Sequence, residues 1–226
     1  MDETTFQHAS NTHEVIITAK KVSLEGFLTV PENAEAIVLF AHGSGSSRFS
    51  QRNRFVAESL NAAGFGTLLF DLLTSEEHVI DERTRHFRFD INLLSARLID
   101  AIDWVKSQDE IRALTIGLFG SSTGAAAALR AAVQRPIQVS AVVSRGGRPD
   151  LTGESLTRVK APTLLIVGGH DEEVIKLNEQ AAKMLNTEYE LQIIPGAGHL
   201  FEETGKLEQV AKIARDWFKK YLAHVS

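Results

Sequence analysis

A serine between two glycines is the residue best suited to chemistry in this chain. Residues 120–124 read Gly-Ser-Ser-Thr-Gly and connect an apolar segment, typical of a short buried strand, to a run of helix-forming alanines. In a Gly-x-Ser-x-Gly turn between a strand and a helix, the serine lies on a sharp, strained backbone with its hydroxyl exposed. Glycine is needed beside it because a side chain there would collide with the neighbouring strand and helix. We therefore expect Ser122 to act as a nucleophile.

Two other interpretations of this turn remain open at the level of sequence. Ser122 could be no more than a small residue at a tight contact between helix and sheet. Ser121 is a rival hydroxyl, but it stands at the first variable position of the pentapeptide and should point elsewhere. Partners for the serine further along the chain decide between these interpretations.

Such partners follow two later strands. Asp171 comes soon after the apolar run 163–169, and His199 comes after the loop that follows the alternating segment 190–194. The order serine, aspartate, histidine is that of an α/β-hydrolase and differs from the orders of unrelated serine proteases. We expect His199 to take the proton of Ser122, and Asp171 to orient the imidazole and stabilise its charged form.

Each partner also has an alternative. Glu172 and Glu173 compete with Asp171 for the role of the acid, and the position at the end of a strand favours Asp171. His199 could instead be a histidine of a surface loop. The three residues in one order along the chain nevertheless favour a catalytic triad.

A glycine-rich loop, His-Gly-Ser-Gly-Ser-Ser at 42–47, follows the apolar segment 36–41. A loop of this kind at the carboxyl end of a strand can turn a backbone N–H towards an oxyanion. We expect the oxyanion to be held by the backbone N–H of Ser44 and by that of Thr123, the residue after the nucleophile. His42 is expected to support this loop with its ring rather than to act as a base.

Three arginines are candidates for binding a substrate carboxylate through a planar, bidentate contact. Arg145 follows an expected strand at the edge of the sheet where ligands bind, although it could equally pair with Asp150 to brace its own loop. Arg83 and Arg85 belong to the charged segment 81–90, which also holds Arg88. Neutralisation by neighbouring acids on a solvated surface is the favoured interpretation of each of these arginines, and a contact of one of them with the substrate is the alternative.

Strands and helices are expected to alternate along the chain. Strands are expected at 14–19, 22–30, 36–41, 66–71, 114–119, 139–144, 163–169 and 190–194. Helices are expected at 53–63, 90–107, 125–132, 174–185 and 206–221. The alternation predicts an α/β fold with a mainly parallel eight-stranded sheet, a starting antiparallel hairpin and helices on both faces. The polar segment 72–89 is expected to be irregular and to form at most a small flap, so no large cap domain is predicted.

Composition limits the class of protein. A chain of 226 residues with 43% hydrophobic residues can bury a large core, and residues 1–226 are expected to form one domain, with 1–12 as a flexible N-terminal segment. The net charge of -5 and the lack of a basic block argue against nucleic acid as a partner. The absence of cysteine excludes disulfides and thiolate metal sites. Without a visible signal peptide or a membrane-length apolar run, we expect a cytoplasmic protein with no membrane partner.

The motifs together resemble the dienelactone hydrolase family of α/β-hydrolases. The resemblance extends over residues 14–222 and includes His-Gly-Ser-Gly-Ser-Ser-Arg at 42–48, Asp-Leu-Leu-Thr at 71–74 and Ser-Arg-Gly-Gly-Arg-Pro-Asp-Leu at 144–151. The branch that the chain resembles has a serine nucleophile, and some of its members carry an attached phosphoribosyltransferase domain. Members that act on dienelactone have a cysteine nucleophile where this chain has Ser122, so the resemblance implies the reaction type rather than that substrate.

The residues and the resemblance together predict a serine hydrolase that cleaves small carboxylic esters or lactones through an acyl-enzyme intermediate. Thioesters and phosphotriesters are expected as promiscuous substrates, because a triad with an oxyanion hole can also stabilise their transition states. No metal or organic cofactor is expected. The alternative is a non-catalytic α/β-hydrolase-fold protein that binds a ligand or a partner. A phosphoribosyltransferase partner is implied by family analogy alone.

Overall fold

One eight-stranded sheet organises the part of the chain that the structure describes, residues 12–20 and 22–222 of a computed structural model. Its strands are β1 Thr12–Ala19, β2 Val22–Thr29, β3 Ala36–Ala41, β4 Gly66–Phe70, β5 Thr115–Ser121, β6 Val139–Arg145, β7 Thr163–Gly168 and β8 Tyr189–Ile194. They lie in the order β1-β2-β4-β3-β5-β6-β7-β8. The hairpin β1–β2 and the pair β2–β4 are antiparallel, and every other neighbouring pair is parallel. The expected sheet is therefore confirmed.

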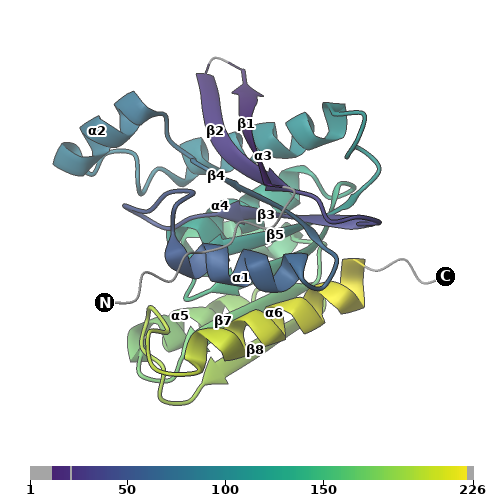
Figure 1. The fold of residues 1–226 in the computed structure, drawn as a ribbon. Helices are drawn as coiled ribbons and strands as arrows, with labels where there is room; N and C mark the ends of the chain where they lie inside the picture. The colour runs from purple at the N-terminus through teal and green to yellow at the C-terminus, as the bar shows by residue number, and fades with distance from the viewer. Residues whose placement is uncertain (1–11, 21, 223–226) are drawn as a thin grey trace, which may run out of the picture.

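Helices cover both faces of this sheet. They are α1 Gln51–Asn61, α3 Ile91–Ser107, α4 Thr123–Gln134, α5 Glu172–Ala182 and α6 Lys206–Leu222. The buried residues of α3, α4 and α5 share one apolar cluster with one face of the sheet, and those of α1 and α6 share a second cluster with the other face. In Figure 1, α1 and α6 lie in front of the sheet. The strands β3, β4 and β7 are buried along their whole length, as expected of parallel strands covered on both faces.

The segment 72–89 is more ordered than expected, because it contains the helix α2 (Ser75–Thr84). A capping box starts this helix: the hydroxyl of Thr74 accepts the N–H of Glu77 at 3.2 Å, and the Glu77 carboxylate accepts the N–H of Thr74 at 2.8 Å. Within α2, Asp81 alone is buried. The helix therefore has no apolar stripe, which is why hydrophobic periodicity does not predict it. It projects at the upper left of Figure 1 and is too short to be a large cap.

Two further differences are smaller. A 3₁₀ segment, Pro149–Arg158, follows β6 in a stretch where the sequence pattern indicates no element. Strand β1 begins at Thr12, the last residue of the expected flexible segment, and residues 1–11 lie outside the described residues. No helix in residues 12–20 and 22–222 is long and apolar enough to cross a membrane.

The carboxyl ends of the parallel strands meet at one edge of the sheet. There the N–H of Ser122, after β5, donates to the carbonyl oxygen of Arg145 at the end of β6, at 3.2 Å. The N–H of His170, after β7, donates to the carbonyl oxygen of Ala197, after β8, at 2.9 Å. Loops that are far apart in the sequence are thus joined at the edge where sheets of this kind bind ligands.

Candidate active site

Ser122 lies on a strained turn between β5 and α4. Its φ of 52° and ψ of -120° fall in a region that residues with a side chain rarely occupy. The flanking glycines allow the turn, since a Cβ on Gly120 would lie 2.4 Å from the Cα of Ala125, and one on Gly124 would lie 2.2 Å from the carbonyl oxygen of Ala41. Both distances are far below real contacts, so only glycine fits at either position.

Backbone hydrogen bonds hold this conformation and do not use the Ser122 hydroxyl. The N–H of Ser122 donates to the carbonyl oxygen of Arg145, and its carbonyl oxygen accepts the N–H of Arg148 at 3.1 Å. The Ser122 side chain makes no capping hydrogen bond to α4. Ser121, by contrast, is buried, and its hydroxyl donates to Oδ1 of Asn53 at 3.0 Å. Of the two hydroxyls in the turn, that of Ser122 is the one available for chemistry.

His199 is paired with Asp171 rather than with a neighbouring glutamate. Nδ1 of His199 lies 2.5 Å from Oδ2 of Asp171. Because an ionised carboxylate only accepts hydrogen bonds, Nδ1 carries the proton and Nε2 is left able to accept one. Glu172 and Glu173 are both exposed in the first turn of α5. The geometry therefore favours Asp171 among the three candidate acids.

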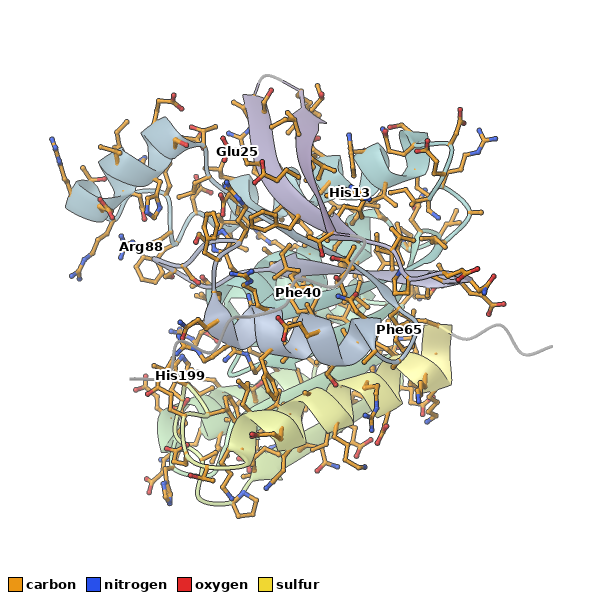
Figure 2. All side chains as sticks on the ribbon, viewed as in Figure 1. His13, Glu25, Phe40, Phe65, Arg88 and His199 are labelled. Atoms are coloured by element: carbon orange, nitrogen blue, oxygen red, sulfur yellow. The ribbon has the colours of Figure 1, made fainter. Side chains whose placement is uncertain are left out.

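The loop that carries His199 is anchored on both sides of the imidazole. Before it, the N–H of Gly198 donates to Oε1 of Glu203 at 2.9 Å. After it, Phe201 is buried, and its N–H donates to the carbonyl oxygen of Gly198 at 3.3 Å. Figure 2 shows His199 at the left of the molecule, the side on which Arg88 also lies.

Ser122 and His199 line one cavity of about 220 Å³. Residues of the loop after β3 and of the first turn of α1 also line it, together with Arg145, Ser121 and Leu200. No Asp or Glu among the described residues lines it. Within the described part of the chain, no hydrogen bond joins the Ser122 hydroxyl to His199. Catalytic hydrogen bonds are often long without substrate and shorten when it binds.

The two residues expected to form an oxyanion hole lie against each other. Oγ of Ser44 is 3.1 Å from Oγ1 of Thr123, and it donates to the carbonyl oxygen of Arg88 at 3.3 Å. Ser44 therefore accepts the hydroxyl proton of Thr123, which links the loop after β3 to the start of α4. Thr123 is the first residue of α4, where backbone N–H groups have no partner within the helix.

A buried acid on α2 holds the segment that meets Ser44, and sequence reasoning missed it. The carboxylate of Asp81 accepts the N–H of Phe87 at 2.7 Å, and the N–H and Nε of Arg88 at 2.9 Å and 2.7 Å. Burial alone would raise the pKa of Asp81, but the hydrogen bonds from Arg88 and Phe87 and the Arg88 charge lower that pKa overall. Helix α2 thus supports the loop after β3 through Arg88 and Ser44, and its capping box was the signal available in the sequence.

His42 supports the same loop, as expected, and is not placed to act as a base. Its Nε2 accepts the N–H of Leu72 at 3.0 Å, and its Nδ1 lies 3.0 Å from the carbonyl oxygen of Gly43. Burial lowers the pKa of His42, against smaller raising effects from the Gly43 carbonyl and from Asp71. The neutral ring thus uses both nitrogens to connect the loop after β3 to the segment just after β4.

Of the three arginines expected to bind substrate, Arg145 reaches the cavity. It is buried, and its Nη2 donates to Oδ1 of Asn53 at 3.3 Å. Asp150, its alternative partner, is bound instead by Arg148, whose Nε donates at 2.9 Å. Asn53 is a cavity residue that sequence reasoning missed, because nothing in its local pattern indicates a contact with β6.

The expectation that Arg83 and Arg85 bind the substrate is corrected, because the structure does not place either residue at the cavity. Both are exposed at the C-terminal end of α2, and neither lines the cavity with Ser122. The physical reason is that Asp81, the buried acid of this segment, binds Arg88 and turns it inwards.

Known proteins resemble this chain over most of its length. Residues 24–225 match the model of the dienelactone hydrolase family. The chain belongs to the dienelactone hydrolase family. A solved dienelactone hydrolase from Anabaena variabilis is 56% identical, with a TM-score of 0.93 over 94% of this chain and 99% of that chain. A dienelactone hydrolase-like promiscuous phosphotriesterase from metagenomic libraries has a TM-score of 0.76 at 16% identity over 94% of this chain and 99% of that chain, and shares the fold. This family member is therefore a hydrolase.

Curated relatives of this dienelactone hydrolase family member come from two strains of Mycobacterium tuberculosis. Each is 57% identical over 209 residues, and both are named provisionally as phosphoribosyl transferases. The match covers 92% of this chain but 46% of each relative, so the chain spans about half of their length. The name given to the longer proteins therefore need not describe the half that matches.

Proposed function

We propose that this hydrolase cleaves carboxylic esters through an acyl-enzyme formed on Ser122. The observation that carries the proposal is the pairing of His199 with Asp171 at 2.5 Å, beside a cavity that the strained Ser122 also lines. Nε2 of His199 takes the Ser122 proton as Oγ attacks the acyl carbonyl, and then gives it to the leaving alcohol. A water molecule, deprotonated by the same imidazole, attacks the acyl-enzyme and releases the acid and the free serine.

The oxyanion of each tetrahedral intermediate needs donors that are in place beforehand. The backbone N–H groups of Ser44 and Thr123 are the proposed donors, supported by the contact between the two side chains at 3.1 Å. Because neither group has to reorganise during the reaction, each can stabilise the developing charge strongly.

Small esters and lactones are the proposed substrates. The cavity of about 220 Å³ is smaller than the roughly 300–1,000 Å³ typical of sites for drug-sized ligands. Helix α2, at 10 residues, does not form the cap that would enclose a long acyl chain. Thioesters and phosphotriesters are proposed as promiscuous substrates, because they develop negative charge at the same place in the transition state.

The test measures hydrolysis of a short-chain aryl ester, such as 4-nitrophenyl butanoate, by variants of two neighbouring serines. Ser122→Ala should lose activity by a factor on the order of 10⁴ or more. Ser121→Ala removes a hydroxyl of the same turn and should keep most of the wild-type activity. If the wild-type chain hydrolyses neither aryl esters nor lactones, the alternative of a non-catalytic ligand- or partner-binding protein replaces the proposal.

A phosphoribosyltransferase is proposed as a partner, because the longer relatives carry that provisional name and this chain matches about half of them. Co-purification of such an enzyme with the tagged chain from its native cells would support the proposal, and its absence there would remove it. We also propose that the protein acts in the cytoplasm on small molecules, without nucleic acid or membrane as a partner.

A further inference from the structure

Arg145 is a buried cation without an acidic partner in the described part of the chain. It is 6% exposed, its Nη2 donates to Oδ1 of Asn53, and its Nε has no hydrogen-bond partner among residues 12–20 and 22–222. The guanidinium also lies 5.9 Å from the centre of the Phe201 ring. Burial lowers the pKa of Arg145 to about 10, with a further lowering by the charge of Arg52. Because an unpaired buried charge is costly, its position on the cavity wall points to an anionic ligand.

The first turn of α1 brings further donors to the same cavity. Ser50, which caps the helix, Arg52 and Asn53 all line it. Nη1 of Arg52 donates to the exposed Glu202 at 2.9 Å, and its Nε is buried with no hydrogen-bond partner in the part of the chain that the structure describes. Oδ1 of Asn53 already accepts two hydrogen bonds, so its Nδ2 group is left as a donor. The first N–H groups of α1 add the positive end of the helix dipole.

These groups make one wall of the cavity positive, because two guanidinium groups and a helix N-terminus meet where no described carboxylate lines the space. We propose that Arg145, Arg52 and the first turn of α1 form a phosphate-binding subsite beside Ser122. The substrate is then an ester or lactone that carries a phosphate monoester group. Hydrolysis of such a substrate rests on the proposed function, whereas the affinity of the subsite for phosphate does not.

The placement of the donors favours a phosphate over a carboxylate. A carboxylate is matched by two parallel N–H groups of one guanidinium, and Asn53 accepts one of the two Nη2 hydrogens of Arg145, which breaks one of its two parallel N–H pairs. The remaining donors come from two separate elements, β6 and α1, and so converge from different directions. A phosphate monoester carries about -1.5 to -2 charges at neutral pH and three strong acceptor oxygens. Phosphate oxygens are also the ligands that helix N-termini commonly bind.

The experiment measures inhibition of 4-nitrophenyl butanoate hydrolysis by phenyl phosphate, benzoate and benzamide, which differ in charge on one aromatic ring. Phenyl phosphate should compete with the ester, with an inhibition constant lower than that of benzoate by roughly tenfold or more, the effect of one charge-assisted hydrogen bond. Benzamide should bind more weakly than both. Equal or tighter binding of benzoate would overturn the phosphate subsite, and three equal constants would overturn any anion subsite.

Substitutions test whether Arg145 and Arg52 cause the tighter binding of phenyl phosphate. Arg145→Met should weaken the binding of phenyl phosphate by roughly tenfold or more and leave the binding of benzamide unchanged. Arg52→Gln should also weaken the binding of phenyl phosphate. Because Arg52 is partly exposed, this variant remains informative if the Arg145 variant does not fold. Arg112→Met is the matched control, because Arg112 is exposed, pairs with Asp109, and precedes β5 at the opposite edge of the sheet. An unchanged affinity in Arg52→Gln together with a folded, unchanged Arg145→Met would overturn the assignment.

A binding measurement separates this inference from the proposed function. Calorimetry with phenyl phosphate on Ser122→Ala, which lacks the nucleophile but keeps the subsite, should show binding that Arg145→Met removes. If the wild-type chain hydrolyses no ester and this binding is present, the proposed function fails and the subsite stands. If esters are hydrolysed and no binding is detected, the subsite fails and the proposed function stands.

Discussion

The hydroxyl oxygens of Ser44 and Thr123 lie 3.1 Å apart, although the residues are 79 positions apart in the sequence. This contact ties the loop after β3 to the first residue of α4. It thereby sets the separation of the two backbone N–H groups proposed to bind the oxyanion. A side-chain hydrogen bond, rather than backbone structure alone, prepares this part of the site.

Removing the Ser44 hydroxyl should slow the chemical step without removing either N–H donor. We expect Ser44→Ala to lower kcat about tenfold, less than the roughly 10²–10³ lost with a whole oxyanion donor. KM should change little, because the ground-state ester does not need the oxyanion geometry. Ser47→Ala is the matched control, since the Ser47 hydroxyl accepts the N–H of Phe49 in the same loop. Equal kcat values for the two variants would contradict the role given to Ser44.

Three consecutive acids follow β7, and one of them should matter for catalysis. Asp171→Asn would present an N–H or a carbonyl where His199 needs a carboxylate, so we expect kcat to fall by about 10⁴. Glu172→Gln and Glu173→Gln change exposed side chains of the next helical turn and should leave kcat nearly unchanged. Steady-state hydrolysis of one aryl ester by the three variants makes the comparison. A loss confined to a glutamate variant would contradict the assignment of Asp171.

Much of the fold and the triad could be predicted from sequence because the signals are local. The turn around Ser122 is encoded by two glycines beside it, and the buried strands are continuous apolar runs. Asp171 comes soon after such a run and His199 soon after the alternating strand β8, so their meeting follows once β7 and β8 are parallel neighbours. The pairing at 2.5 Å is then a consequence of topology.

Contacts between distant elements could not be predicted in the same way. Arg145 meets Asn53 across 92 positions, and no short-range pattern relates a strand end to the first turn of α1. Helix α2 was not predicted because its single buried residue, Asp81, is an acid and so adds no apolar periodicity. The arginine that Asp81 binds is Arg88, and charge patterning alone does not distinguish it from its exposed neighbours.

Backbone strain at the nucleophile should make the active serine a destabilising residue. Because Ser122 has a φ of 52°, Ser122→Gly should raise the free energy of unfolding above that of Ser122→Ala by about 1 kcal/mol. Both variants should be inactive, since both lack the hydroxyl. Chemical denaturation of the two variants measures the difference. A glycine variant no more stable than the alanine variant would contradict stored strain at this turn.

The buried His42 should make stability depend on pH in a defined direction. Its pKa is lowered by burial, so the unfolded chain takes up a proton below about pH 6.5 while the folded chain does not. The contribution of His42 to stability is therefore greatest above about pH 6.5 and falls as the pH drops towards the folded pKa.

The difference in the free energy of unfolding between the wild type and His42→Asn tests this dependence. Above neutral pH the variant should be less stable by about 1–3 kcal/mol, because the buried N–H of Leu72 loses its acceptor. That deficit should shrink as the pH falls below about 6.5. Thermal or urea unfolding of both proteins across the acidic range measures it. A deficit that is constant or grows towards acid would contradict a neutral, buried His42.

The central claim is that Ser122 is an activated nucleophile, and covalent labelling tests it most directly. The chain is treated with diethyl 4-nitrophenyl phosphate, and the intact mass, the released nitrophenol and the modified peptide are measured. We predict transfer of one diethyl phosphate group per chain to Ser122 with release of one nitrophenol, in the wild type and in Ser121→Ala but not in Ser122→Ala. Later loss of this group from Ser122 with further nitrophenol release would be the promiscuous phosphotriester hydrolysis proposed above. A wild-type chain that stays unmodified and releases no nitrophenol, or a label on Ser121, would contradict the account.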